Sequence, residues 1–305
     1  MKDKRFYRTF FAMYIVLVFQ NVISLSVNLA DNIMLGAYSE TSLSGVAAVN
    51  QIQFIYQQLL MAAGDGMVIF CSQYWGKKQI GPVKKIAATA MHTGLAFALI
   101  LFLAVSLFPH RAVGLFTTDE AIIAEGVKYL AVIRFTYLFF AVTTILLATL
   151  RSVEIVKIAF YLSVSTLVIN CCINYVLIYG KFGAPQLGVI GAAIGTLAAR
   201  IIECAVAVWY VLKKEPNLKM RISDYFHTDR ILRKDYYKTT LPMLVVQGLW
   251  GLNTAMQTAI LGHMTARAIA ANSAASNLFL MVKSMAVGAS SAASVVIGKT
   301  IGEGD

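Results

Sequence analysis

Long apolar segments alternate with short polar segments along most of this chain. Each apolar run is close to the length of about 20 residues that an α-helix needs to cross roughly 30 Å of hydrocarbon. The runs lack the alternation of polar and apolar positions over about ten residues that barrel strands show. The pattern predicts an all-α, polytopic membrane protein with eight spans, at about residues 9–31, 46–72, 87–109, 127–149, 158–179, 188–212, 239–262 and 268–297.

Composition supports this fold class. The 305 residues are 58% hydrophobic and only 13% charged, with a mean hydropathy of +0.70, whereas soluble domains carry about 25% charged residues. The N-terminus, "MKDKRFYRTFFAMYIVLVFQN", joins a basic start to an apolar run as a signal peptide does, but no small-residue cleavage site follows. We therefore interpret this segment as an uncleaved first span.

The formal net charge of +11 reflects membrane topology. Lys and Arg gather before the first span and in every second connection, including Arg151 and Lys157 in the connection after the fourth span. The alternate connections (32–45, 110–126, 180–187 and 263–267) contain only Arg111, Lys181 and Arg267. This asymmetry follows the positive-inside rule. It predicts a multi-pass protein of the inner (plasma) membrane, with a cytoplasmic N-terminus and no nucleic-acid partner.

The longest polar stretch, 213–238, separates two similar parts of the chain. "FYRTFFAMYIVLV" (6–18) is similar to "YYKTTLPMLVVQG" (236–248), and "SQYWGKKQ" (72–79) to "GKTIGEGD" (298–305). Such repeats are typical of transporters whose substrate site lies between the halves. We therefore expect a six-helix bundle at 1–212, a cytoplasmic linker at 213–238, and the first two helices of a second bundle at 239–305. Because the second copy stops after two spans, we interpret the chain as a fragment.

A polar stripe runs along the first span. Its one charged member is Asp31, which lies within an arc of roughly 120° at 100° per residue together with the other members: Gln20, Asn21, Ser24, Asn28 and Asn32. Ser and Asn often join helices to each other in membranes, which is our interpretation of Ser24. A carboxylate at this depth is rare and usually marks an ion or substrate path, so we expect Asp31 to be functional.

Polar residues also share one face on later spans. Asn170 and Asn174, one turn apart on the fifth span, offer amide groups to a small cation or to a neighbouring carboxylate. On the sixth span Thr196 shares a face with Arg200 and Glu203, and the two charged residues are spaced to pair with each other.

Two further charged residues are candidates for lining a cavity. Asp65, flanked by glycines in the second span, is open to a functional or a structural interpretation. Lys283 on the eighth span shares a face with Ser290, Ser294, Asn272 and Ser276, and we expect it to point into a cavity.

No enzyme motif is visible in the sequence: there is no P-loop, HExxH or GxSxG. Without an ATP site, transport would draw its energy from an ion gradient. A buried carboxylate suits ion coupling, because it can carry a proton or help to bind Na⁺.

Three motifs resemble the multidrug and toxic compound extrusion (MATE) family: "LADNIMLG" (29–36), "SQYWGKK" (72–78) and "NYVLIYGKFGAPQLGVIGAAIGT" (174–196). The resemblance covers the first eight of the family's twelve helices, so it implies a two-bundle antiporter architecture with the second bundle incomplete. It further implies a monomeric, bilayer-embedded multidrug efflux antiporter. Such a protein exports organic cations and other small organic molecules in exchange for H⁺ or Na⁺, with no other cofactor.

The family's cation site maps onto Asp31, Asn170, Asn174 and Thr196. Many relatives have Asp where Asn174 stands, and the loss of that carboxylate favours H⁺ over Na⁺ as the coupling ion. Many relatives also have a glutamate five positions after the proline of the seventh helix, where this chain has Gln247 after Pro242. Gln247 is therefore a cavity candidate without an acidic group.

Two other functions remain open on the sequence. A flippase-like exporter of lipid-linked or polysaccharide substrates would need a strongly cationic cavity. The charges placed in spans are balanced, however, with Asp31, Asp65 and Glu203 against Arg134, Arg200 and Lys283. A non-transporting truncated form, or a membrane enzyme, is the remaining alternative.

Overall fold

A computed structural model describes residues 4–215, 218, 220–261 and 266–304 of the chain. Most of the described residues are helical and none of them is in a strand, which confirms the all-α fold class. Ten α-helices follow one another: α1 (Lys4–Tyr38), α2 (Glu40–Gly76), α3 (Ile80–Leu107), α4 (Pro109–Gly114), α5 (Glu120–Ile133), α6 (Thr136–Ser152), α7 (Lys157–Tyr179), α8 (Val189–Trp209), α9 (Arg230–Leu261) and α10 (Ala266–Glu303).

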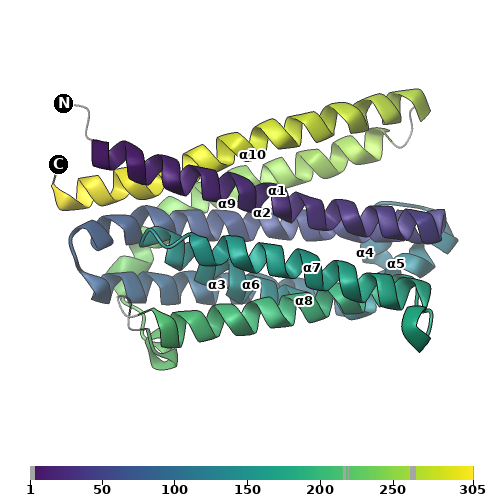
Figure 1. The fold of residues 1–305 in the computed structure, drawn as a ribbon, viewed down its shortest axis with the longest axis horizontal. Coiled ribbons are helices and arrows are strands. Elements are labelled where there is room, and N and C mark those ends of the chain that lie inside the picture. Colours follow the sequence, from purple (N-terminus) through teal and green to yellow (C-terminus); the bar gives the residue numbers. More distant parts are fainter. Residues whose placement is uncertain (1–3, 216–217, 219, 262–265, 305) are drawn as a thin grey trace.

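The long helices lie roughly parallel to one axis of the molecule (Figure 1). α1 begins and α10 ends at the same end, beside the turn between α2 and α3 (Figure 1). We call this the basic end, because the connections there carry Lys77, Lys78, Lys213 and Lys214.

Six of the eight predicted spans correspond to single helices that are long and apolar enough to cross a membrane. The fourth does not run straight, because α5 and α6 meet at a bend of 55°. At this bend Thr136 Oγ1 donates a hydrogen bond of 2.6 Å to the carbonyl oxygen of Ile133. The Thr136 hydroxyl thus satisfies a backbone carbonyl at the break between the two helices.

The seventh predicted span, 239–262, is less apolar than expected. It falls in α9, which is long enough but is not among the helices of sufficient hydropathy in the described part of the chain. Gln247 and Asn253 interrupt its apolar sequence. Polar side chains are tolerated in such a helix where they face protein or a water-filled cavity.

The predicted connection 32–45 is also wrong in length. α1 continues to Tyr38 and α2 begins at Glu40, which leaves only Ser39 between them. The Ser39 hydroxyl accepts a hydrogen bond of 3.3 Å from the backbone N–H of Ser42 and so caps α2. The predicted connection 263–267 falls mostly outside the described residues.

The packing of α1, α2, α9 and α10 follows the internal repeat. α1 packs on α10 and α2 packs on α9, and exchanging the two repeat copies turns one of these contacts into the other. The alignment of 72–79 with 298–305 makes Gln73 the counterpart of Lys299 and Gly76 the counterpart of Gly302. A Cβ on Gly76 would meet the Lys299 carbonyl, and a Cβ on Gly302 would meet the Gln73 carbonyl.

These reciprocal contacts place a local two-fold axis between α2 and α10 at the basic end. Gly298, the counterpart of Ser72, also packs directly against Ser72. Gly298 and Gly302 form a GxxxG motif, which lets two membrane helices approach closely. An ion pair of 2.7 Å between Lys299 Nζ and Glu154 Oε2 lies beside this contact.

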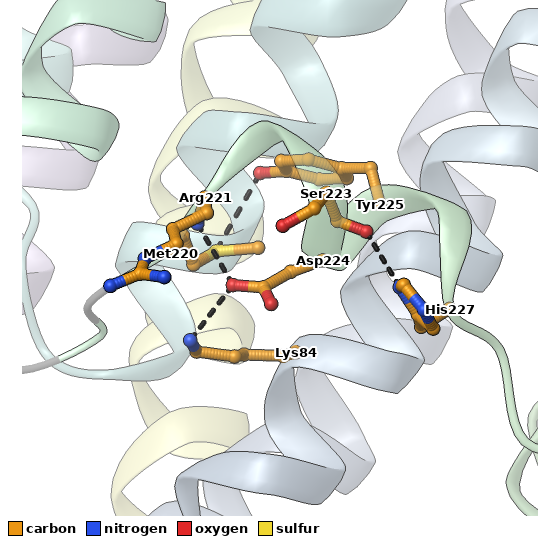
Figure 2. Close-up of polar contacts among 7 residues, drawn as sticks. All are labelled: Lys84, Met220, Arg221, Ser223, Asp224, Tyr225 and His227. Atoms are coloured by element: carbon orange, nitrogen blue, oxygen red, sulfur yellow. Dashed lines mark hydrogen bonds and ion pairs between the residues drawn. The ribbon is translucent and has the colours of Figure 1, made fainter.

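The segment between α8 and α9 is bound to α3 at the basic end. It includes a short 3₁₀ helix, η3 (Ile222–Phe226), and the irregular part ends where α9 begins at Arg230. Figure 2 shows Asp224 of η3 between Lys84 of α3 and the backbone of Arg221. Asp224 Oδ2 accepts a hydrogen bond of 2.8 Å from Lys84 Nζ and another of 2.8 Å from the backbone N–H of Arg221. Burial raises the pKa of Asp224, but these two hydrogen bonds outweigh it and hold the pKa below its usual value of 3.8.

A second ion pair continues this attachment, with Lys85 Nζ 3.3 Å from Asp229 Oδ2. The other oxygen of Asp229 accepts hydrogen bonds from the backbone N–H groups of Ile231 and Leu232 and so caps α9. These backbone bonds, and then Lys85, lower the pKa of the Asp229 carboxyl. The segment is therefore attached to α3 where it turns into α9.

We predict that Gly302→Ala destabilises the contact between α2 and α10 by about 1–3 kcal/mol, because the new methyl group meets a backbone carbonyl that cannot rotate away. Thermal unfolding of the purified chain in detergent measures the effect. Gly81→Ala is the matched control, since nothing lies within 4 Å of its Cβ position. Equal melting temperatures for the two variants would contradict the packing.

We predict that Asp224→Asn weakens the attachment of η3 by less than about 1 kcal/mol, because the ion pair with Lys84 is partly exposed. A carboxyl with a lowered pKa stabilises the fold above its ordinary pKa and loses this contribution as the pH falls through the folded value. The difference between wild type and variant should therefore shrink once the pH falls below 3.8 and vanish below the folded pKa, which lies lower still. Thermal unfolding against pH tests this, with the exposed Asp235→Asn as the control expected to have no effect.

Candidate functional site

Four of the predicted site residues form one hydrogen-bonded chain. Asn174 Nδ2 donates to Asp31 Oδ1 at 2.6 Å and to Asn170 Oδ1 at 3.2 Å. Asn170 Nδ2 in turn donates to Thr196 Oγ1 at 3.1 Å. The structure therefore joins α1, α7 and α8 through polar side chains at one place.

Local geometry explains this arrangement. Asn170 and Asn174 are one turn apart on α7, and both are 0% exposed. Gly195 of α8 packs against the Asn174 amide, and a Cβ there would collide with Asn174 Oδ1. That oxygen is buried without a hydrogen-bond partner among the described residues. This hydrogen-bonded chain thus contains two acceptors. The Asp31 carboxylate can accept a proton or a cation, and the amide oxygen of Asn174 can accept a cation.

A polar cavity lies beside this chain. Its two parts have volumes of about 240 and 300 Å³ and share lining residues from α1, α2 and α10. The structure places all six predicted cavity candidates on its walls: Gln20, Ser24, Asn28, Asp65, Gln247 and Lys283. Their roles in transport stay predictions.

Two polar residues of α1 differ in how they bond. The Ser24 hydroxyl donates to the carbonyl of Gln20 in its own helix, at 2.9 Å, so it does not link α1 to another helix as expected. Asn21 does provide such a link, because its Nδ2 donates to the Ser284 carbonyl of α10 at 3.4 Å.

Arg151 lines the cavity, although its position in the sequence predicted otherwise. Because it follows the fourth apolar run, the sequence predicted that it belongs to a connection outside the membrane. In the structure its Nη2 lies 2.6 Å from Asp65 Oδ1, and its Nη1 donates to Ser291 Oγ at 3.4 Å. The ion pair joins α2 to α6, and the serine adds α10. The one signal in the sequence for a place inside the protein is that Arg151 lies directly at the end of an apolar run.

Arg200 connects the cavity with the hydrogen-bonded chain. It lines the cavity, pairs with Glu203 at 2.6 Å as its spacing predicted, and lies over the Phe140 ring at 4.8 Å. It also attracts Asp31 electrostatically. A change of charge on Asp31 therefore changes the electrostatic environment of Arg200, which lines the cavity wall.

Known proteins resemble the chain. A sequence profile of the MatE family matches residues 17–176, more than half of its length. The "Uncharacterized transporter YisQ" of Bacillus subtilis is 25% identical over 277 residues, which cover 90% of this chain and 60% of that protein. A "Probable multidrug resistance protein NorM" of Thermotoga maritima is 27% identical over 197 residues, which cover 64% of this chain and 42% of that protein.

Solved structures share the fold. A multidrug resistance MATE family transporter in an outward-facing conformation superposes with a TM-score of 0.84 at 17% identity, over 97% of this chain and 65% of that one. The chain thus spans between 42% and 65% of the length of these three proteins.

We predict that Asp65→Asn lowers the free energy of unfolding, because Arg151 loses its counter-charge. The ion pair is partly exposed, so we expect a loss of about 1–3 kcal/mol, between the values for exposed and buried ion pairs. A double-mutant cycle with Arg151→Met, followed by thermal unfolding, isolates the pair from other losses. If the two substitutions are additive, the ion pair contributes nothing.

Proposed function

The chain belongs to the MatE family, and on that premise we propose that it acts as a secondary antiporter that exports small organic molecules, drugs among them, in exchange for an ion. The observation that carries this proposal is the Asp31 carboxylate, held by Asn174 in the membrane-spanning part and coupled through Arg200 to a polar cavity. A carboxylate in a span is costly and is typical of ion pathways.

Protonation of Asp31 supplies the coupling step. When a carboxylate oxygen of Asp31 takes up a proton, the residue loses its negative charge and its attraction for Arg200. Arg200 then interacts with Glu203 and the cavity contents alone. The balance of charge at the cavity wall therefore differs between the protonated and the ionised state, which links ion binding to substrate binding.

We propose H⁺ rather than Na⁺ as the coupling ion. Only one carboxylate belongs to the hydrogen-bonded chain, and the Asn174 side chain presents an N–H group to it. A sodium ion would have to replace this donor with an oxygen ligand, whereas a proton needs only a free lone pair on Asp31.

The contact between α2 and α10 supports a closed gate at the basic end. Close glycine packing and the Lys299–Glu154 ion pair join the two repeat copies there. We propose that this end faces the cytoplasm of a plasma membrane, with the N-terminus inside, and that the contact separates when the cavity opens inward. The bilayer is the immediate environment, and the expected unit is a monomer.

A flippase of lipid-linked sugars has less support. Arg151 adds a cation to the cavity, so the balance expected from the sequence shifts by one positive charge. Four of the cavity's charges nevertheless form two ion pairs. A pyrophosphate-bearing substrate would need several unpaired cations at one place.

We predict that Asp31→Asn abolishes ion-driven efflux, because the amide cannot be deprotonated and so holds Arg200 in one state. The measurement is dye efflux from cells that lack their own pumps, with ethidium as a cationic dye and a xanthene dye that carries a free benzoate. Asp235→Asn, outside the cavity, is the control and should export like wild type.

Unchanged efflux of every exported dye by Asp31→Asn would refute the role of Asp31. Efflux of neither dye by the wild-type chain, in cells where its membrane insertion is verified, would refute the proposed function.

A further inference from the structure

Lys283 stands apart from the other charged residues of the cavity. Asp65 is bound by Arg151 and Glu203 is bound by Arg200, each at 2.6 Å, so both carboxylates of the cavity wall already have a cation. Lys283 lines the larger part of the cavity and forms no ion pair with any residue that the structure describes. Its positive charge is therefore not neutralised by the cavity wall.

An aromatic ring holds Lys283 in place without cancelling its charge. Its Nζ lies 4.1 Å from the centroid of the Trp250 ring, which stacks in turn on Phe279. A cation–π contact attracts the ammonium group but provides no hydrogen-bond acceptor. The indole N–H of Trp250 is also buried without an acceptor among the described residues. This place is thus rich in donors and lacks an acceptor.

The rest of the wall around Lys283 suits an amphipathic molecule. Val287 and Ser291 follow Lys283 at helical spacing on α10 and line the same cavity. The remaining lining combines apolar side chains, such as Phe54, with the amide of Gln247. A volume of about 300 Å³ in this part is at the lower end of the range for small-molecule sites, roughly 300–1,000 Å³.

Charge decides which molecules gain most from this wall. A cationic molecule finds both carboxylates occupied and must compete with Arg151 or Arg200. An anionic group meets Lys283 without breaking an ion pair, and it forms a charge-assisted hydrogen bond, the stronger kind. A lysine in a span is costly, and a substrate that neutralises it recovers part of that cost.

We propose that Lys283 binds a carboxylate or similar anionic group of the transported molecule, so that the chain prefers amphipathic organic acids and zwitterions to purely cationic drugs. This inference rests on the proposed function and specifies its substrate class. It narrows the expectation, taken from the family resemblance, that the chain exports organic cations and other small organic molecules.

A matched pair of dyes tests this preference. A xanthene dye with a free benzoate and its methyl ester differ in the carboxylate alone. We expect the purified chain in detergent to bind the acid about tenfold more tightly than the ester in fluorescence polarisation, the size of one charge-assisted hydrogen bond. Lys283→Gln should remove the difference, and Lys283→Arg should retain it.

The control variant is Lys213→Gln, an exposed lysine outside the cavity, which should keep the wild-type preference. Equal binding of acid and ester by the wild-type chain would overturn the inference, as would a preference that survives Lys283→Gln. Because binding is measured without an ion gradient, this outcome is separate from that of the efflux experiment. Asp31-dependent export of the ester with no preference for the acid would leave the proposed function standing and refute the role of Lys283.

Discussion

Charged and polar side chains inside hydrocarbon need protein partners, because each unsatisfied group there costs several kcal/mol. This constraint organises the centre of the molecule. Asp31 is held by Asn174 across two helices, and the Asp65–Arg151 ion pair links two more. The polar faces of the helices therefore turn inward together, while large apolar side chains of α1, such as Phe19 and Ile33, remain exposed where lipid can cover them.

A tight contact and a cavity both lie between α2 and α10, at different points along the two helices. At the basic end, glycines of α2 and α10 bring the two backbones together. Farther along the same helices the facing residues include Asp65 on α2 and Lys283 on α10, and the space between them is a cavity. Small residues thus close one end of the interface, and charged residues line the cavity at the other part.

The cavity and the hydrogen-bonded chain are connected by Arg200. It faces Glu203 and the cavity on one side and attracts Asp31 on the other. The coupling that we propose between ion and substrate would therefore require no long path, since one guanidinium group interacts with Asp31 and also lines the cavity. Lys283 of α10 lines the other part of the same cavity, whose walls come from both repeat copies.

The sequence by itself determined the helical membrane fold, the internal repeat and the polar faces. Helical spacing is a property of one segment, so the polar stripe that contains Asp31 and the pair Asn170 and Asn174 could be identified without a structure. Spacing also predicted the pairing of Arg200 with Glu203, which lie on one helix. These features depend only on residues close together along the chain.

Tertiary structure decided which of these faces meet. Arg151 was assigned to a connection, because nothing in its own segment shows that Asp65 and Ser291 lie beside it. The bend between α5 and α6 lies inside one apolar run, and the helices on both sides of Ser39 extend beyond the apolar runs that predicted them, so only the structure shows where these helices end. The unneutralised charge of Lys283 is likewise a property of the assembled cavity, since it exists only because its neighbours pair with each other.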